Sequence, residues 1–130
     1  MKFVCLVYID KAKISGLTPE EGKQLTDDTI EDDNRLRREG RLILAQPLLE
    51  PETAVTLRVD GAGVVSATDG PFAETKEHLG GFYIIEAANM DEAKKIAETD
   101  RMMTFGSIEI RPTLEQTHSV TGEGRPELQL

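Results

Sequence analysis

The sequence predicts an α+β domain in which two helices cover one face of a ferredoxin-like antiparallel sheet. Three observations lead to this fold class. A chain of 130 residues with 38% hydrophobic and 30% charged residues has the ordinary composition of one globular domain. Short runs of β-forming residues alternate with two segments that carry helix-start signals. Their order is strand, helix, strand, a hairpin insert, strand, helix, strand, which contains two β-α-β units.

Helix-start signals locate the two helices. Thr18 is a favourable N-cap, Pro19 suits the first helical position, and Glu21 completes a capping box. This helix is expected to run to about Glu39. Gly40 then ends it. Asn89, with Glu92 three residues later, opens the second helix in the same way.

The strands are short apolar or alternating runs, and Asp60-Gly61 is a hairpin turn signal. We therefore expect a domain over residues 1–113. Residues 114–130 are polar, without a periodic apolar face, and are expected to form a flexible C-terminal tail. The predicted strands are residues 2–8, 41–46, 53–59, 64–68, 82–86 and 107–111.

Three of these strands are apolar at odd and even positions alike, namely residues 2–8, 41–46 and 82–86. Because successive side chains of a strand point to opposite faces, both faces of the sheet must be buried. Two helices can cover only one face. A second copy of the chain is the simplest cover for the other, so a homodimer is expected; the alternative is a large exposed apolar patch.

Charge and composition exclude several classes of partner. The net charge of −9 argues against binding to nucleic acid or to an anionic membrane surface, both of which need clustered Lys and Arg. No apolar stretch is long enough for a signal peptide or a membrane span, so a cytoplasmic protein is expected. Two isolated histidines and a single cysteine give no metal-ligand spacing, and no cofactor is expected. Cys5 lies in an apolar run and is expected to be a buried small side chain.

Candidate site residues gather in the segment from Asp69 to His78. Asp69 precedes a Gly-Pro turn, where its carboxylate either caps backbone N–H groups or acts as a general base beside a cleft. Glu74 is a second candidate proton acceptor, although a solvated charged loop explains it equally well. The ligand-binding candidates are Phe72 as a pocket wall or a plug under the loop, Lys76 as a cation for an anionic substrate, Glu77, and His78, for which an exposed, ordinary imidazole is the simpler interpretation.

Asp32 and Asp33 form a second candidate site on the first helix. Asp32 falls on the inward line of that helix, where a carboxylate is costly unless it is paired or solvated. If either residue borders a cleft opposite Asp69, the two carboxylates would repel and one would hold its proton more tightly. Asp33 is therefore a third catalytic candidate, with a solvated helix surface as the alternative.

The segment Asp69-Gly70-Pro71-Phe72-Ala73-Glu74-Thr75-Lys76-Glu77, followed by Leu79-Gly80-Gly81-Phe82-Tyr83, resembles the signature of the DGPF branch of the YCII-related family. The resemblance extends from residue 1 to about 113. It implies a dimeric α/β-barrel of ferredoxin-like subunits with a cleft near the DGPF loop. It also implies a genetic setting beside extracytoplasmic-function sigma factors. A more distant relative resembles a dehydrochlorinase with a His–Asp pair, but the first helix here has no histidine to match.

Two functions stay open at this point. One is a cofactor-independent small-molecule enzyme that uses carboxylates for proton abstraction, elimination or isomerisation. The other is a non-catalytic ligand-binding or regulatory module, linked to sigma-factor-dependent transcription. Both use a cleft between the DGPF loop, the first helix and the dimer seam, and the substrate, the protein partner and the role of the tail are not determined by the sequence.

Overall fold

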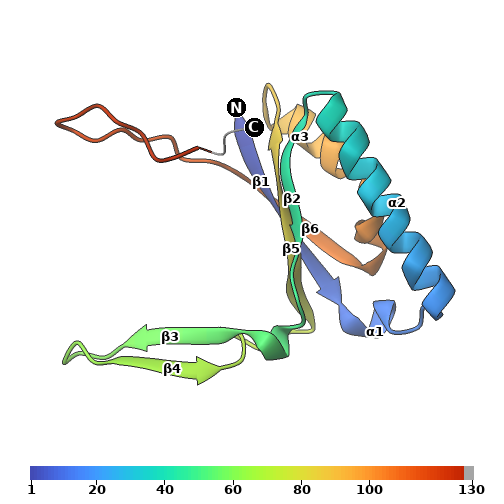
Figure 1. The fold of residues 1–130 in the computed structure, drawn as a ribbon, viewed down its shortest axis with the longest axis horizontal. Coiled ribbons are helices and arrows are strands. Elements are labelled where there is room, and N and C mark those ends of the chain that lie inside the picture. Colours follow the sequence, from blue (N-terminus) through green and yellow to red (C-terminus); the bar gives the residue numbers. More distant parts are fainter. Residues whose placement is uncertain (128–130) are drawn as a thin grey trace.

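The computed structural model describes residues 1–127 and has an α+β fold built on a four-stranded antiparallel sheet in the order β2-β5-β1-β6. Helices α2 and α3 both lie on one side of this sheet, as Figure 1 shows with the sheet seen edge-on. The predicted fold class, an antiparallel sheet with a hairpin insert, is confirmed. The main elements are β1 (Lys2–Asp10), α1 (Lys11–Ile14), α2 (Pro19–Arg38), β2 (Leu42–Pro47), β3 (Val55–Val59), β4 (Val65–Asp69), β5 (Glu77–Glu86), α3 (Met90–Ala97) and β6 (Gly106–Pro112), with 3-10 turns η1 (Pro51–Thr53) and η2 (Arg101–Phe105).

The predicted helix starts are confirmed in their hydrogen bonds. Thr18 Oγ1 accepts from the Glu21 amide at 3.1 Å, and Glu21 accepts from the Thr18 amide at 3.0 Å. Asn89 Oδ1 accepts from the Glu92 amide at 3.0 Å. These bonds satisfy amide groups that have no partner within the helix. The local sequence therefore fixes where both helices begin.

The core lies between the sheet and the helices. Phe3, Cys5 and Ile85 are fully buried, together with Ala93 and Ile96 of α3. On β1 and β5 these core residues alternate with half-buried side chains that face away from the helices, such as Leu6 and Ile84. The helices therefore leave the second face of the sheet uncovered in a single chain.

Strand β5 is longer than the predicted strand at residues 82–86, because it begins at Glu77. Strand β1 continues to Asp10, which pairs with Glu77. Because of this pairing, β5 begins five residues before the predicted start at residue 82. Gly80 is an extra residue in the ladder, since Val7 pairs with Gly81 while Tyr8 pairs with Leu79. This bulge lies beside both pockets described below.

Two short segments differ from the sequence prediction. The loop expected at residues 9–17 contains α1, which Asp10 caps by accepting from the Ala12 amide at 3.0 Å. Residues 101–105 form η2, which Asp100 caps by accepting from the Met102 amide at 2.8 Å. Gly106 follows at a close approach to β1, where a side chain would overlap the Tyr8 carbonyl oxygen. Short capped turns of this kind carry no periodic signal in the sequence.

Two segments project from the uncovered side of the sheet. The β3–β4 hairpin extends from one end, and the C-terminal segment extends from the other end (Figure 1). The hairpin forms its own two-stranded sheet. The predicted tail folds back on itself within the described residues, where Thr117 pairs with Gly124 and the His118 amide donates to the Glu123 carbonyl at 2.7 Å.

Candidate functional site

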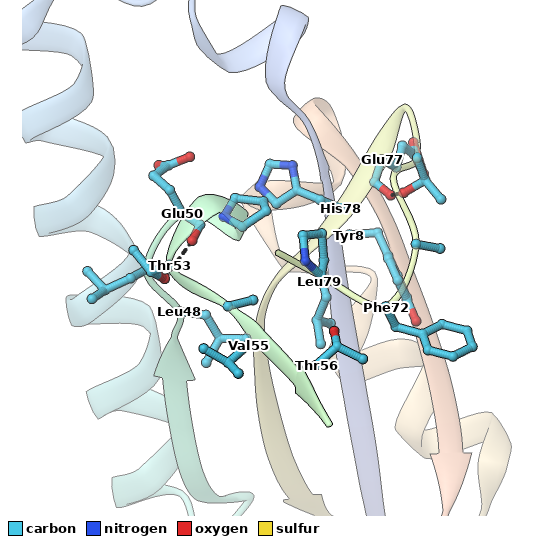
Figure 2. Close-up of a pocket in the computed structure, with 16 residues that line it drawn as sticks. Tyr8, Leu48, Glu50, Thr53, Val55, Thr56, Phe72, Glu77, His78 and Leu79 are labelled. Atoms are coloured by element: carbon cyan, nitrogen blue, oxygen red, sulfur yellow. Dashed lines mark hydrogen bonds between the residues drawn. The ribbon is translucent and has the colours of Figure 1, made fainter. Parts of the chain in front are cut away.

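Most of the residues predicted from the sequence lie around the base of the β3–β4 hairpin. A pocket of about 890 Å³, here called the hairpin pocket, opens between the hairpin and the end of the sheet. Figure 2 shows His78, Leu79 and Tyr8 on the sheet side of this pocket, with Val55 and Thr56 from β3. Its lining is mostly apolar and includes Leu48, Leu49, Pro51, Pro71 and Phe72. Such a pocket suits an apolar ligand.

Phe72 and His78 both line the hairpin pocket. Phe72 is 76% exposed, so it forms part of the wall and does not plug a gap under the loop, and the Arg58 guanidinium lies 4.9 Å from its ring centre. His78 is half-buried because it belongs to β5 and pairs with Ile9. The expectation that His78 is exposed is therefore wrong, because strand pairing draws the residue into the pocket wall.

The charged candidates lie at the edges of this region. Glu77 accepts a hydrogen bond from Ser107 Oγ at 2.6 Å, which ties β5 to the start of β6. Lys76 is exposed, and its Nζ lies 3.8 Å from the carboxylate of the buried Asp10. Asp69 and Glu74 are exposed and line a separate hollow of about 530 Å³.

The turn after Asp69 is held by backbone groups. The Gly70 amide donates to the Ala54 carbonyl at 2.7 Å, and Thr56 Oγ1 donates to the Gly70 carbonyl at 2.8 Å. The Asp69 carboxylate accepts no hydrogen bond from any residue in the range 1–127. The expected capping of backbone N–H groups by Asp69 is therefore not formed.

Asp33 lies in a different place, in a smaller pocket of about 150 Å³ on the helix side of β5. We call this the carboxylate pocket. Its acidic residues are Asp33 from α2 and Asp100 from the cap of η2, and Asp69 is not among its lining residues. The pairing of Asp33 with Asp69 across one cleft is therefore wrong. The remaining lining residues are Val7, Ile9, Thr29, Ala45, Gln46, Pro47, Gly80, Gly81, Phe82, Tyr83 and Met102.

Ion pairs of Arg101, here called the clamp, join η2 to α2 and bring the carboxylates of Asp33 and Asp100 together. Arg101 donates to both oxygens of Asp32, through Nε at 2.6 Å and Nη2 at 3.1 Å, and its Nη1 lies 3.5 Å from Asp28. Because Asp33 and Asp100 are the chain neighbours of the clamped pair, they meet at the same pocket. Asp32 is therefore an ion-paired residue, which explains how a carboxylate is tolerated on the inward line of the helix.

The electrostatics of this pocket favour the protonated form of its acids. Burial, and after it the charges of Asp100 and Asp32, together raise the pKa of Asp33 to about 6. Burial also raises the pKa of Asp100, although the hydrogen bond from the Met102 amide partly opposes this. The pKa of Asp32 is lowered by its hydrogen bond from Arg101. Adjacent carboxylates thus have opposite shifts, because only one of them is clamped.

Tyr83 adds a hydroxyl group to the same pocket. Its side chain is only 7% exposed, and its Oη has no partner in hydrogen-bond geometry among residues 1–127, although it lies near enough to Cys5 and Asp100 to act against burial and lower the pKa of both groups. Buried polar groups normally have a partner, so an unpaired hydroxyl in a pocket wall calls for a ligand or a water. Cys5 pairs with Tyr83 across the ladder, and burial raises the pKa of its thiol to about 11, so it stays protonated and unreactive at neutral pH.

Comparison with known proteins identifies the family. The model of the YCII-related domain matches residues 1–117. The chain belongs to the YCII-related family. It is also 36% identical over 114 residues to an uncharacterised protein of Rhizobium meliloti, covering 86% of this chain and 91% of that relative.

Among solved structures, this YCII-related chain is similar to 5-chloro-2-hydroxyhydroquinone dehydrochlorinase from Burkholderia phenoliruptrix in complex with 2,5-dihydroxybenzoquinone. The identity is 16%, the TM-score is 0.47, and the match covers 89% of this chain and 96% of that one. None of the helices described for the YCII-related chain combines the length and the apolar character needed to cross a membrane. Residues 1–127 contain no group of three or more His, Cys, Asp and Glu side chains placed to hold a metal ion.

Sequence reasoning missed two residues of the carboxylate pocket, Asp100 and Tyr83. Tyr83 lies in a strand with apolar residues on both faces, so the sequence pattern predicts a core residue there. Only its hydroxyl group distinguishes it from the apolar residues around it. Asp100 stands directly after the second helix, and the signal available for it was its cap position two residues before Met102. Asp33 was found for its acidity, but its true neighbour depends on tertiary packing.

Proposed function

We propose that this protein is a cofactor-independent acid–base enzyme that acts on a small molecule in the carboxylate pocket. One observation carries the proposal: Asp33, with a pKa of about 6, shares a small and largely apolar pocket with Asp100 and with the unpaired hydroxyl of Tyr83. A carboxyl group whose pKa lies near the working pH both accepts and returns a proton efficiently.

In this proposal each group has a role. Asp33 takes a proton from an activated carbon or hydroxyl of the substrate, and the Tyr83 hydroxyl donates a hydrogen bond to the oxygen on which negative charge develops. Asp100 keeps the pKa of Asp33 high through its charge. If the proton returns to another atom the result is isomerisation. If a leaving group departs with the electron pair the result is elimination.

This assignment changes the set of catalytic candidates. Asp33 is kept, and Asp100 replaces Asp69 as its neighbour. Asp69 and Glu74 line the exposed hollow of the hairpin and share no pocket with Asp33, so nothing in their position supports a catalytic role. We place the chain in the DGPF branch of its family on the segment 69–77, and we expect a cytoplasmic location.

Solvent deuterium exchange tests the proposal without knowledge of the substrate. Small neutral ketones, hydroxyketones and phenols are incubated with the protein in D₂O, and loss of C–H signals is followed by proton NMR. We expect the wild-type chain to accelerate exchange in at least one compound, and Asp33→Asn to lose about 10²-fold or more of that rate. Asp27→Asn, an equal change at an exposed position of α2, should keep the wild-type rate. An unchanged rate in Asp33→Asn, or no exchange in any compound, would contradict acid–base catalysis.

A second candidate function is a ligand-binding module linked to sigma-factor-dependent regulation. The size and apolar lining of the hairpin pocket favour it. Thermal shift with a library of apolar and aromatic compounds tests this function, since a bound ligand raises the melting temperature. If the hairpin pocket is the working site, Phe72→Ala removes the shift and Asp33→Asn keeps it. The opposite pattern assigns the ligand to the carboxylate pocket.

A homodimer is the third part of the proposal. Val4, Leu6 and Ile84 are half-buried and alternate with the core residues of β1 and β5, which places them on the uncovered face of the sheet. Contact with the same face of a second copy, related by a two-fold axis, would remove this apolar surface from water. Sedimentation equilibrium from micromolar to near-millimolar concentration is the test. A monomer throughout that range would contradict the dimer.

A further inference from the structure

The β3–β4 hairpin has one apolar face and one polar face. Strand register places Leu57 opposite Ala67 and Val59 opposite Val65, so their side chains share a face with Val55, whose own partner Asp69 is the one charged residue of that face and lies at the base of the hairpin. We call this the apolar hairpin face. Its large side chains are 60–68% exposed. The other face carries Thr56, Arg58, Ser66 and Thr68.

This face is preformed by the local sequence. The Asp60 carboxylate accepts from the Ala62 amide at 2.8 Å and the Val64 amide at 3.0 Å, and the Asp60 amide donates to the Val64 carbonyl at 3.0 Å. Gly63 takes a φ of 79°, which the turn requires. The hairpin therefore has a specified shape, and its apolar face is a surface and not a disordered loop.

Residues 1–127 provide no cover for the apolar hairpin face. The hairpin forms a separate two-stranded sheet and projects away from α2 and α3 (Figure 1). An isolated two-stranded hairpin is marginally stable in water, and it gains stability by packing against another surface. Exposed contiguous apolar patches of this kind mark interaction sites.

We infer that the β3–β4 hairpin is an arm that packs its apolar face against a second copy of this chain. This inference rests on the homodimer proposed above. The hairpin and the uncovered sheet face are on the same side of the molecule (Figure 1), so a copy that approaches one surface also approaches the other. A two-fold axis then makes each contact twice.

The surface available also favours a second copy. A stable interface buries about 800 Å² per partner. The sheet-face residues Val4, Leu6 and Ile84 are already half-buried by their neighbours, so they contribute only part of their surface. The hairpin side chains are about two-thirds exposed and supply apolar area that the sheet face lacks. A second copy carries the same apolar sheet face and the same apolar hairpin face.

The arm also completes the hairpin pocket. That pocket is lined by Tyr8 and Leu79 at the end of the sheet and by Val55 at the base of the arm. A partner that covers the sheet face and grips the arm also closes the mouth of this pocket. The ligand site around Phe72 and His78 is therefore incomplete in a single chain.

Matched charge substitutions on the two faces of the hairpin test the inference. Leu57→Lys puts a charge on the apolar hairpin face, and Ser66→Lys puts the same charge on the polar face of the same hairpin. Leu6→Lys puts it on the uncovered sheet face. Each full-length variant is studied by sedimentation equilibrium, with far-ultraviolet circular dichroism and urea unfolding to check the fold.

We expect Leu57→Lys to weaken dimerisation at least tenfold, while Ser66→Lys leaves the dissociation constant within twofold of wild type. Equal dissociation constants for the Leu57→Lys and wild-type dimers would overturn the inference that the hairpin packs against the second copy. This holds even if Leu6→Lys weakens the dimer, a result that would support pairing through the sheet face alone. If Leu57→Lys unfolds, Val65→Lys replaces it. A monomeric wild type overturns both the arm and the dimer, whereas deuterium exchange by the wild type remains an independent test of the acid–base function.

Discussion

At the scale of single residues, the ionisation of Asp33 is coupled to folding. The pKa of its carboxyl group is about 6 in the folded chain, against the ordinary value of 3.8 that applies in the unfolded chain. The folded chain binds more protons than the unfolded chain between these values. The free energy of unfolding therefore falls as the pH rises from about 4 to 6, and the stabilising effect of the protonated form is lost above that range. Asp33→Asn removes this dependence.

We predict that Asp33→Asn gains stability relative to wild type as the pH rises, by about 1–2 kcal/mol between pH 4 and pH 8. One pKa unit corresponds to 1.36 kcal/mol, and this figure is reduced because the group is only half-buried and is coupled to Asp100. Urea unfolding at several pH values measures the difference. Asp27→Asn should show a constant offset from wild type, and a parallel pH curve for Asp33→Asn would contradict the assignment.

Tyr83 separates stability from function. Since its hydroxyl is buried without a partner in the described chain, Tyr83→Phe removes no hydrogen bond and is expected to change the free energy of unfolding by less than about 1 kcal/mol, toward greater stability. The same change should slow deuterium exchange at least tenfold, because a donor to the substrate oxygen is lost. Tyr8→Phe, outside the carboxylate pocket, is the control. A loss of stability with unchanged exchange would show that Tyr83 is structural only.

Among the secondary-structure elements, α2 and η2 depend on Arg101 for their relative position. Arg101 bridges the two elements through Asp32, whereas Arg35 contacts the same carboxylate at 3.4 Å from within α2. We predict that Arg101→Met lowers the free energy of unfolding at least twice as much as Arg35→Met does, because only the first change separates two elements. Urea unfolding at pH 7 measures both. Equal losses would contradict the clamp.

The elements also show what the sequence determines and what it does not. Thr18, Glu21 and Asn89 act through neighbours three residues away, so the helix starts could be predicted from the sequence. The start of β5 could not, because Glu77 joins the strand through its partner Asp10, far away in the chain. Local signals predict local bonds, and strand ends are set by pairing.

The site followed the same division. Asp33 was recognised as a candidate only as one of two adjacent acids on the first helix, and the local argument that a buried carboxylate is costly applied to its neighbour Asp32. Its partner was misassigned to Asp69. The two residues that share its pocket, Asp100 and Tyr83, come from η2 and β5, and only the packing of α2 over the sheet brings them together. A site assembled from three separate elements leaves no spacing pattern in the sequence.

For the molecule as a whole, the start of β5 connects the two pockets. His78 and Leu79 line the hairpin pocket on the uncovered side, and Gly80 and Gly81 line the carboxylate pocket on the helix side. The bulge at Gly80 lies between them. Ligands in the two pockets would therefore contact the same short segment of β5. A substitution in residues 78–81 is expected to affect both pockets.

The net charge of −9 determines how dimerisation responds to salt. Two such chains repel each other at long range, while the surfaces proposed to meet are apolar and contribute no attraction between opposite charges. Salt screens the repulsion, since the Debye length falls to about 10 Å at 0.1 M. We predict that the dimer becomes several-fold tighter as the salt concentration rises from roughly 20 mM to 200 mM, measured by sedimentation equilibrium at pH 7.5. An interface held by ion pairs would weaken instead, because the same screening would remove its attraction. Weaker dimers in higher salt would therefore contradict an apolar seam and direct attention to the charged edges, such as Lys76 and Arg111.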